Sequence, residues 1–285
     1  MDFKFDTKTG FMCSTDSYEN SKIILYGAPM DFTVSFKPGT RMGPIKIREV
    51  SYALEEYSIY LSDSLTNKIY YDAGDLEMPL GNVNESLKII YEATKSILDD
   101  HKTPFLIGGE HLVSLPAIKA TSEKYNDLIV IQFDAHADLR DEYSGEKYSH
   151  ATVMRRAAEI VNPQNIYQLG IRSGTDEEIN FAKKHTNFYP LTFKEELSDI
   201  IESIGKKPIY LTIDIDVIDP AFAPGTGTPE PGGCTSFEMI DTIIKLGSLN
   251  IVGMDLVEVL PYFDLSDRTA LLAAKIIREI LIIKG

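Results

Sequence analysis

Short apolar runs recur along the chain and alternate with longer stretches in which apolar residues follow a helical period. Runs of about four to eight apolar and β-branched residues, without alternation of polar and apolar positions, are typical of strands buried on both faces. The pattern predicts six such strands, at residues 22–26, 104–107, 128–133, 166–169, 208–213 and 251–256. Strands of this kind belong to parallel sheets that helices cover on both sides.

Helical periodicity fills the intervals between these strands. In residues 83–99, for example, Leu87, Ile90 and Ile97 lie on one side of a helix. The pattern predicts eight helices, at 44–56, 83–99, 113–124, 150–160, 176–184, 193–204, 236–246 and 268–283. Strand and helix alternate from end to end without a repeat or a linker. We therefore expect an α/β fold with a mostly parallel sheet, in a single domain over residues 1–285.

The composition is that of an ordinary globular protein, with 44% apolar and 25% charged residues among 285. The formal net charge of −15 argues against nucleic-acid binding, because phosphate contacts need an excess of Lys and Arg. The same charge suits a cationic ligand or metal ions, although acidity also serves solubility alone.

Cysteine usage and hydropathy indicate the compartment. Cys13 and Cys234 are far apart, which predicts neither a disulfide framework nor a zinc–thiolate site and favours a reducing compartment. The first eight residues contain no apolar leader, and no run approaches the roughly 20 apolar residues that cross a bilayer. We expect a cytoplasmic protein that binds no membrane.

Polar and acidic residues directly follow four of the predicted strands. In open parallel sheets, ligands bind outside the carboxyl ends of the strands, so these side chains should meet at one sheet edge. The segments are Gly108-Gly109-Glu110-His111, Asp134-Ala135-His136-Ala137-Asp138, Asp214-Ile215-Asp216 and Val257-Glu258.

Six of these residues form a ligand set for metal ions, since alternate residues of an extended chain point the same way. They are His111, Asp134, His136, Asp138, Asp214 and Asp216. Six ligands exceed the need of one tetrahedral ion and suit two ions that share a carboxylate. The carboxylates carry about −4, which two divalent ions would cancel. The set favours two Mn²⁺ per chain, and Fe²⁺, Co²⁺ and Zn²⁺ stay open because Mn²⁺ has the lowest affinity in the Irving–Williams order.

Each group taken alone has a simpler explanation. Gly108-Gly109 before a helix could form an anion-binding turn for phosphate, and His111 could be a core or capping histidine. Asp214 and Asp216 could cap a helix, and Glu258 could be a solvated charge at a strand end. Their occurrence together, on successive strand ends, is what predicts a binuclear metal site.

Another histidine, His150, stands at the start of the predicted helix 150–160. If Ser149 simply caps this helix, His150 is an ordinary exposed residue. In the functional interpretation, His150 is a titratable group beside the metal ions that shuttles protons. His101 and His185 lie in charged, surface-like stretches, and we assign them no role.

The motifs resemble those of a known family. The segments Gly108–His111, Asp134–Asp138 and Thr212–Pro220 resemble the three signature motifs of the ureohydrolase family, which includes arginases and agmatinases. Residues 37–48, 223–233 and 253–261 look like the agmatinase branch in particular, and the likeness extends over nearly the whole chain.

The resemblance implies a three-layer αβα fold around an eight-stranded, mostly parallel sheet, a binuclear Mn²⁺ centre, and a homotrimer or homohexamer. It also implies how the ligands divide between the ions. One ion would be held by His111, Asp134, Asp138 and Asp214, and the other by His136, Asp134, Asp214 and Asp216, with Asp134 and Asp214 shared. The guanidinium-binding glutamate of the family corresponds to Glu258, and its acid–base histidine to His150.

The implied reaction is the hydrolysis of agmatine to putrescine and urea, a step of polyamine biosynthesis. A hydroxide between the two ions attacks the guanidinium carbon, while Glu258 pairs with the guanidinium and holds it in place. Asp138 passes a proton to the leaving amine, and His150 exchanges protons with solvent.

The loop at 139–147 bears on which guanidino compound is hydrolysed. Its acidic residues favour a cationic tail over a carboxylate tail; they are Asp141, Glu142 and Glu146. Arg140 and Lys147 could instead hold the carboxylate of guanidinobutyrate, so a guanidinobutyrase or an arginase-like enzyme is the alternative. The family often has Thr at the position of Ala137, which should alter packing rather than metal binding.

Two further classes are less compatible with the residues. A two-metal phosphoesterase needs Arg, Lys or a nest of N–H groups beside the ions, whereas these strand ends supply almost only acids. A non-catalytic relative with a stiffening metal site would not need His150 and Glu258 beside a full ligand set. Metal-dependent stability without turnover would support that last class.

Overall fold

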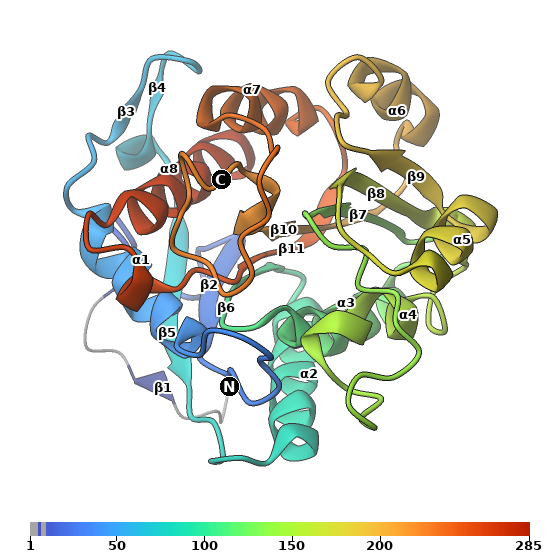
Figure 1. The fold of residues 1–285 in the computed structure, drawn as a ribbon. Helices are drawn as coiled ribbons and strands as arrows, with labels where there is room; N and C mark the ends of the chain where they lie inside the picture. The colour runs from blue at the N-terminus through green and yellow to red at the C-terminus, as the bar shows by residue number, and fades with distance from the viewer. Residues whose placement is uncertain (1–4, 7–9) are drawn as a thin grey trace.

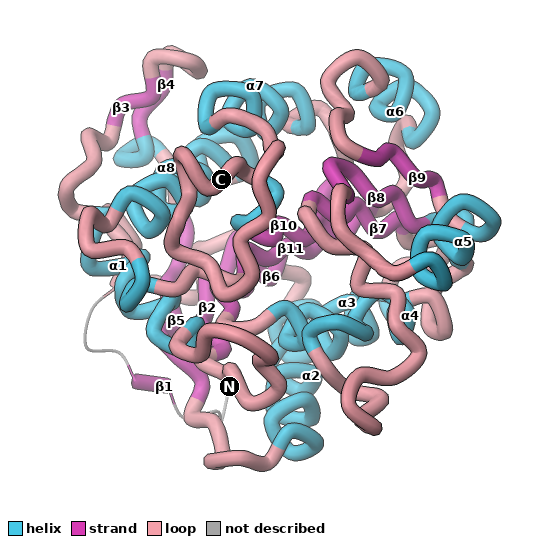
Figure 2. The backbone as a smooth tube through the Cα atoms, in the orientation of Figure 1, coloured by secondary structure: helices cyan, strands magenta, loops and turns pink. Residues whose placement is uncertain are grey.

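The computed structural model describes residues 5–6 and 10–285, and a nine-stranded sheet runs through it. The strand order is β1-β5-β2-β6-β11-β10-β7-β8-β9. Within the described residues, the eight strands from β5 to β9 pair in parallel, and β1 is antiparallel to β5 at one edge. Helices lie on both faces of this sheet (Figures 1 and 2).

Six of the parallel strands are those that the apolar runs predict. They are β2 (Ile23–Ala28), β6 (Thr103–Gly108), β7 (Ile129–Phe133), β8 (Ile166–Ile171), β10 (Ile209–Asp214) and β11 (Ile251–Val257). The sequence pattern did not predict β1 (Phe5–Asp6), β5 (Tyr70–Leu76), β9 (Asn187–Pro190) or the separate hairpin of β3 (Tyr57–Ser58) and β4 (Asp63–Ser64).

The parallel strand β5 escapes prediction because its sequence contains two carboxylates. Arg48, which is buried in α1 (Gly43–Ser51), neutralises them: its Nε lies 2.7 Å from Oδ2 of Asp72, and its guanidinium also pairs with Asp75. The other parallel strand that the sequence pattern did not predict, β9, is only partly buried at the sheet edge and has no continuous apolar run.

Two hydrophobic cores, one on each face of the sheet, make the molecule a three-layer αβα structure. Along β10, Leu211 and Ile213 belong to one core, whereas Tyr210 beside them belongs to the other. The first core is covered by α1, α6 (Leu197–Ile204), α7 (Ser236–Leu246) and α8 (Arg268–Lys284). The second is covered by α2 (Val83–Asp99), α3 (Ser114–Lys124), α4 (Val153–Ala157) and α5 (Asp176–His185). The expected fold class is confirmed.

The helices α2 and α7 have the predicted bounds, and α3, α5 and α8 differ from theirs by one residue, whereas the other three are shorter by several residues. The helix predicted at 44–56 ends at Ser51, whose hydroxyl donates to the carbonyl of Arg48 and so competes with the next helical turn. The helix predicted at 193–204 begins at Leu197. The one predicted at 150–160 is a 3₁₀ turn followed by the short helix α4.

Among the described residues, no helix combines the length and the apolarity that crossing a bilayer requires. The expectation of a missing leader concerns the first eight residues, most of which lie outside the described part of the chain.

Candidate metal centre

The carboxyl ends of four neighbouring strands, β6, β11, β10 and β7, carry the predicted site. A cavity of about 270 Å³ opens above them. Six of the eight predicted site residues line it: His111, His136, Asp138, His150, Asp214 and Glu258. The other two, Asp134 and Asp216, are buried in contact with these ligands.

One group of ligand atoms surrounds Nδ1 of His111. This atom lies 3.0 Å from Oδ2 of Asp134, 3.1 Å from Oδ2 of Asp138 and 3.5 Å from Oδ2 of Asp214. The ligand atoms of His111, Asp134 and Asp138 lie close enough together to hold one metal ion. Asp214 lies slightly farther from His111 than the other two carboxylates do.

A second group surrounds Nδ1 of His136, which lies 3.0 Å from Oδ2 of Asp216 and 3.6 Å from Oδ1 of Asp134. His136, Asp134 and Asp216 also meet the geometry of a metal-binding group. Asp134 belongs to both groups and offers one carboxylate oxygen to each.

The polar atoms of the first group need a cation rather than another hydrogen bond. Nε2 of His111 lies 3.0 Å from the hydroxyl of Thr212, which gives its own hydrogen to Asp255, so the imidazole donates there and Nδ1 faces the carboxylates. Nδ1 of His111 and Oδ2 of Asp216 are both buried without a hydrogen-bond partner. Two buried polar atoms without a partner, one in each ligand group, fit a metal centre.

The electrostatics of the ion-free site point the same way. Burial opposes protonation of His136, but the charges of Asp216 and Asp134 outweigh it and raise its pKa to about 12. Burial, with the charge of Asp134, raises the pKa of Asp138 to about 7. Burial, with the charge of Asp216, raises the pKa of Asp214 well above its ordinary range. The cluster therefore recruits protons when ions are absent.

The second glycine of the first motif, Gly109, serves a close approach of two backbone segments. A Cβ atom on Gly109 would lie 2.0 Å from the carbonyl oxygen of Met30. The N–H groups of Gly109 and Glu110 donate to the carbonyls of Ala28 and Met30, so these donors are engaged within the protein. This arrangement does not support the alternative of a phosphate-binding turn.

Glu258 is a buried carboxylate at the end of β11, and not a solvated charge. Its Oε1 accepts a hydrogen bond of 2.7 Å from the N–H of His111, which fixes the carboxylate relative to the first ligand group. Burial raises its pKa well above the ordinary range. A buried carboxylate in this position is suited to a cation.

His150 is both next to a helix cap and part of the cavity. Ser149 forms the predicted cap, as a capping box with Thr152, and Nε2 of His150 lies 3.2 Å from Oγ of Ser35. Burial, together with the charges of His136 and His111, lowers the pKa of His150 to about 4, so its imidazole is neutral at physiological pH.

Tyr143 and Glu178 line the cavity and were not predicted from the sequence, whereas Arg140 was, as a possible partner of a carboxylate tail. Arg140 lies over the ring of Tyr143, with its Nε 3.6 Å from Glu178, and all three line the cavity. The three acids of the loop at 139–147 are not among the lining residues, and Asp141 pairs with Arg156 at 2.6 Å instead. Tyr143, an aromatic residue within that acidic loop, was the feature of the sequence that could have indicated a further cavity residue.

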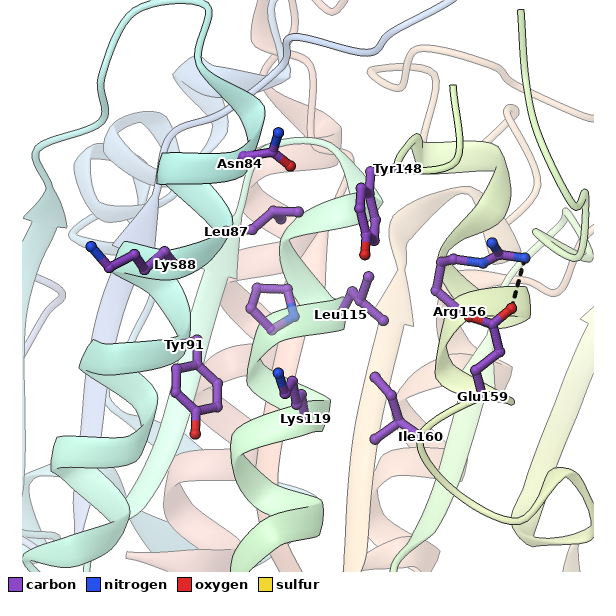
Figure 3. Close-up of a pocket in the computed structure, with 11 residues that line it drawn as sticks. Asn84, Leu87, Lys88, Tyr91, Leu115, Lys119, Tyr148, Arg156, Glu159 and Ile160 are labelled. Carbon is purple, nitrogen blue, oxygen red and sulfur yellow. Dashed lines mark ion pairs between the residues drawn. The ribbon is translucent and has the colours of Figure 1, made fainter. Parts of the chain in front are cut away.

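A separate pocket of about 410 Å³ lies between α2, α3 and the segment that leads into and out of α4 (Figure 3). Leu87, Leu115 and Ile160 give it an apolar floor, and Arg156 pairs with Glu159 at its side. It shares no lining residue with the cavity of the candidate metal centre, so the two are distinct.

Comparison with known proteins agrees with this geometry. The model of the arginase family matches residues 21–283. The chain is 50% identical over 275 residues to an agmatinase of Bacillus subtilis and 49% identical to one of Bacillus cereus, with 95% of each chain covered in both cases. The crystal structure of the agmatine ureohydrolase of Thermoplasma volcanium superimposes with a TM-score of 0.90 at 31% identity, covering 98% of this chain and 95% of the other. A match that spans nearly all of the chain, together with relatives of such identity, shows that the chain belongs to the arginase family.

Proposed function

We propose that the chain is an agmatinase, which hydrolyses agmatine to putrescine and urea with two bound Mn²⁺ ions. The observation that carries the proposal is the meeting of two histidines, four aspartates and Glu258 at one sheet edge. The identity of about one half to proteins named agmatinases supports the choice of substrate.

The residues present fit two divalent ions that share ligands. We assign one ion to His111, Asp134, Asp138 and Asp214, and the other to His136, Asp134, Asp214 and Asp216. Carboxylate oxygens with two imidazoles suit Mn²⁺, which prefers such ligands over thiolates. When bound, two such ions would supply a hydroxide at neutral pH, because divalent ions lower the pKa of coordinated water.

Glu258 would hold the guanidinium of the substrate. A planar guanidinium and a carboxylate form paired, charge-assisted hydrogen bonds, which are strong in a buried site. Because His111 fixes Oε1 of Glu258, the substrate carbon would be placed at a defined position relative to the ligand groups.

Asp138 and His150 would move the protons. The carboxylate of Asp138 faces both the ligand group and the cavity, so it can carry a proton from the nucleophile to the leaving amine. His150 is neutral and lines the same cavity, which would let its imidazole exchange the other protons of the reaction with solvent.

A second candidate substrate is a guanidino acid such as 4-guanidinobutyrate. One observation favours it: Arg140 lines the cavity and could bind a carboxylate tail. Against it, Glu178 lies 3.6 Å from Nε of Arg140 and compensates its charge. We accordingly place agmatine first.

The setting of this activity follows from the same assignment. We propose a single catalytic domain over residues 1–285, located in the cytoplasm and assembled as a homotrimer or homohexamer. Putrescine as a product would place the reaction in polyamine biosynthesis.

The test is urea release by Mn²⁺-loaded protein from agmatine, with arginine and 4-guanidinobutyrate in parallel. We expect rapid turnover of agmatine and little of the other two. Faster turnover of 4-guanidinobutyrate would keep the chemistry and replace the substrate. If none of the three compounds releases urea although two ions are bound, the assignment as an enzyme is wrong and a non-catalytic relative is favoured.

A further inference from the structure

Two buried glutamines lie side by side beneath the candidate metal centre. Gln132 of β7 and Gln168 of β8 face each other in register, and both are fully shielded from solvent. Apart from Gln132, β7 consists of apolar residues. A primary amide in such a place needs partners for two hydrogens and an oxygen, because an unpaired buried polar atom is costly.

Backbone carbonyls fix the orientation of both amides. Nε2 of Gln168 lies 2.9 Å from the carbonyl of Ala137, and Nε2 of Gln132 lies 3.3 Å from that of His136. A carbonyl only accepts, so each contact identifies the nitrogen end of its amide. The second hydrogen of Gln168 then goes to Oε1 of Gln132 at 2.7 Å.

With its oxygen engaged by Gln168, Gln132 directs its remaining hydrogen at Asp134. Its Nε2 donates to Oδ2 of Asp134 at 2.7 Å. The other oxygen, Oδ1, accepts from the N–H of His136 at 2.6 Å. The Asp134 carboxylate is therefore held from both sides, and its rotation about the terminal bond is restricted.

That restriction matters because Asp134 is the ligand common to both groups. Oδ2 faces His111 at 3.0 Å, and Oδ1 faces His136 at 3.6 Å. A carboxylate that serves two ions has to present one oxygen to each of them. A rotated carboxylate would leave one group a ligand short.

We propose that Gln132, oriented by Gln168, is a positioning residue that aligns the Asp134 carboxylate between two metal ions. The inference rests on the metal part of the proposed function. A neutral donor suits this role, because a Lys or Arg would compete with the ions for the carboxylate and an acid would repel it.

The experiment measures Mn²⁺ binding by titration calorimetry and metal content for the full chain and three variants. These are Gln132→Met, Gln168→Met and the double substitution. Methionine approximates the shape of glutamine but cannot donate. We expect Gln132→Met to weaken binding by about 10- to 100-fold, the usual effect of losing a partner that orients a ligand. Gln168→Met should weaken it less.

The double variant distinguishes positioning from general destabilisation. Because Gln168 acts through Gln132, the double variant should bind Mn²⁺ almost as well as Gln132→Met alone, a strongly non-additive result. The matched control is Thr121→Val, which removes a buried hydrogen bond to the carbonyl of Ala117 within α3 and should leave Mn²⁺ affinity unchanged.

Wild-type affinity in folded Gln132→Met, or an equal loss of affinity in Thr121→Val, would overturn the inference. If Gln132→Met does not fold, Gln168→Met alone tests the inference, and wild-type Mn²⁺ affinity in that variant would likewise overturn it. None of these measurements needs urea release. A protein that binds ions but lacks turnover would refute the proposed function and leave the positioning role intact.

Discussion

Two residues of the candidate site, Asp138 and Glu258, adopt left-handed backbone conformations, with φ of 52° and 64°. Such conformations are unfavourable for residues other than glycine and persist where neighbouring contacts enforce them. The carbonyl of Asp138 accepts from the N–H groups of Met154 and Arg155, and the N–H of Glu258 donates to the carbonyl of Gly109. The surrounding backbone thus holds both carboxylates in place before any ligand arrives.

This arrangement allows the role of Glu258 to be tested alone. Glu258→Gln keeps an oxygen that can accept from His111, so the ligand groups should remain and two Mn²⁺ should still bind. Loss of the charge-assisted pair with a guanidinium should lower kcat/KM for agmatine by about 100-fold or more. Metal analysis together with steady-state kinetics checks both parts. An unchanged kcat/KM would remove Glu258 from substrate binding.

Substitution of Asp134, the ligand common to both groups, should have a different effect from Glu258→Gln. In Asp134→Asn, one carboxylate oxygen becomes an amide nitrogen, which cannot bind a metal ion in its place. We expect the variant to lose metal and urea release together, as measured by metal content per chain and by activity. Asp214→Asn should behave similarly. Retention of two ions by either variant would show that the assignment of shared ligands is wrong.

The histidines predict how metal binding depends on pH. Nearby carboxylates raise the pKa of His136 to about 12 and that of His111 well above its usual value, so both imidazoles are protonated at neutral pH when ions are absent. Each must lose its proton to bind a metal ion, and any proton held by Asp138 or Asp214 must leave as well. Mn²⁺ affinity should therefore increase with pH, and binding should release at least about two protons per chain. Calorimetry in buffers of different ionisation enthalpy measures that number; zero release would contradict the protonated state.

For individual residues, the sequence allowed the metal ligands to be predicted, but not the residues whose hydrogen bonds orient those ligands. His111 and the aspartates follow strands, where metal chemistry is a common reason for such residues. Gln132 and Asp255 instead lie within apolar strands, where a single polar residue has no meaning until the neighbouring strand is known. The register of β7 with β8 and of β10 with β11 supplies those partners.

Among the elements, the loop at 219–233 between β10 and α7 is tied to the segment before it by the side chain of Arg172. The guanidinium of Arg172 donates to the carbonyls of Asp216 at 2.6 Å, Glu230 at 2.7 Å and Val217 at 3.2 Å. Gly233 permits this approach, since a Cβ there would lie 2.7 Å from Nη2 of Arg172. The contact joins the loop to the backbone of a predicted metal ligand.

Removal of this contact should loosen the loop. We expect Arg172→Met to lower the free energy of unfolding by about 2–3 kcal/mol, because several buried carbonyls lose a charged donor. Amide hydrogen exchange should accelerate within residues 219–233 and stay unchanged in α2. Denaturant unfolding and exchange mass spectrometry measure the two effects, and Arg172→Lys, with fewer donors, should be intermediate. Unchanged exchange in the loop would contradict the role of Arg172.

The elements also differ in how well the sequence predicts them. Helix α2 has a clear apolar stripe and an Asn82 cap, and α7 has a capping box, so their bounds follow from local chemistry. The strand β5 depends on a partner 24 residues earlier in the chain, since Arg48 neutralises Asp72 inside the protein. An ion pair between distant residues cannot be read from hydropathy.

For the molecule as a whole, the concentration of acid at one sheet edge ties stability to metal ions. Removing the ions leaves four neighbouring aspartates with only protons to compensate their charge. We expect a chelator to lower Tm and added Mn²⁺ to restore it, with about 2.7 kcal/mol of stabilisation from each bound ion when free Mn²⁺ exceeds the Kd of that ion by about 100-fold. Thermal unfolding across a Mn²⁺ series tests this. A Tm independent of Mn²⁺ would show that the site does not bind the ion in the folded state.

The order of the strands has a consequence for how the protein is made. Among the described residues, β11 is the last strand in sequence order, and it lies between β6 and β10, near the middle of the sheet. When synthesis has reached only residue 250, all the strands of the sheet except β11 are present. The edges of β6 and β10 that will flank β11 then have no hydrogen-bonding partner. Glu258 directly follows this strand, so the nascent chain acquires its complete site only after β11 has been synthesised. Premature termination before β11 would therefore yield chains with unpaired strand edges and an incomplete site, and such chains are prone to aggregate.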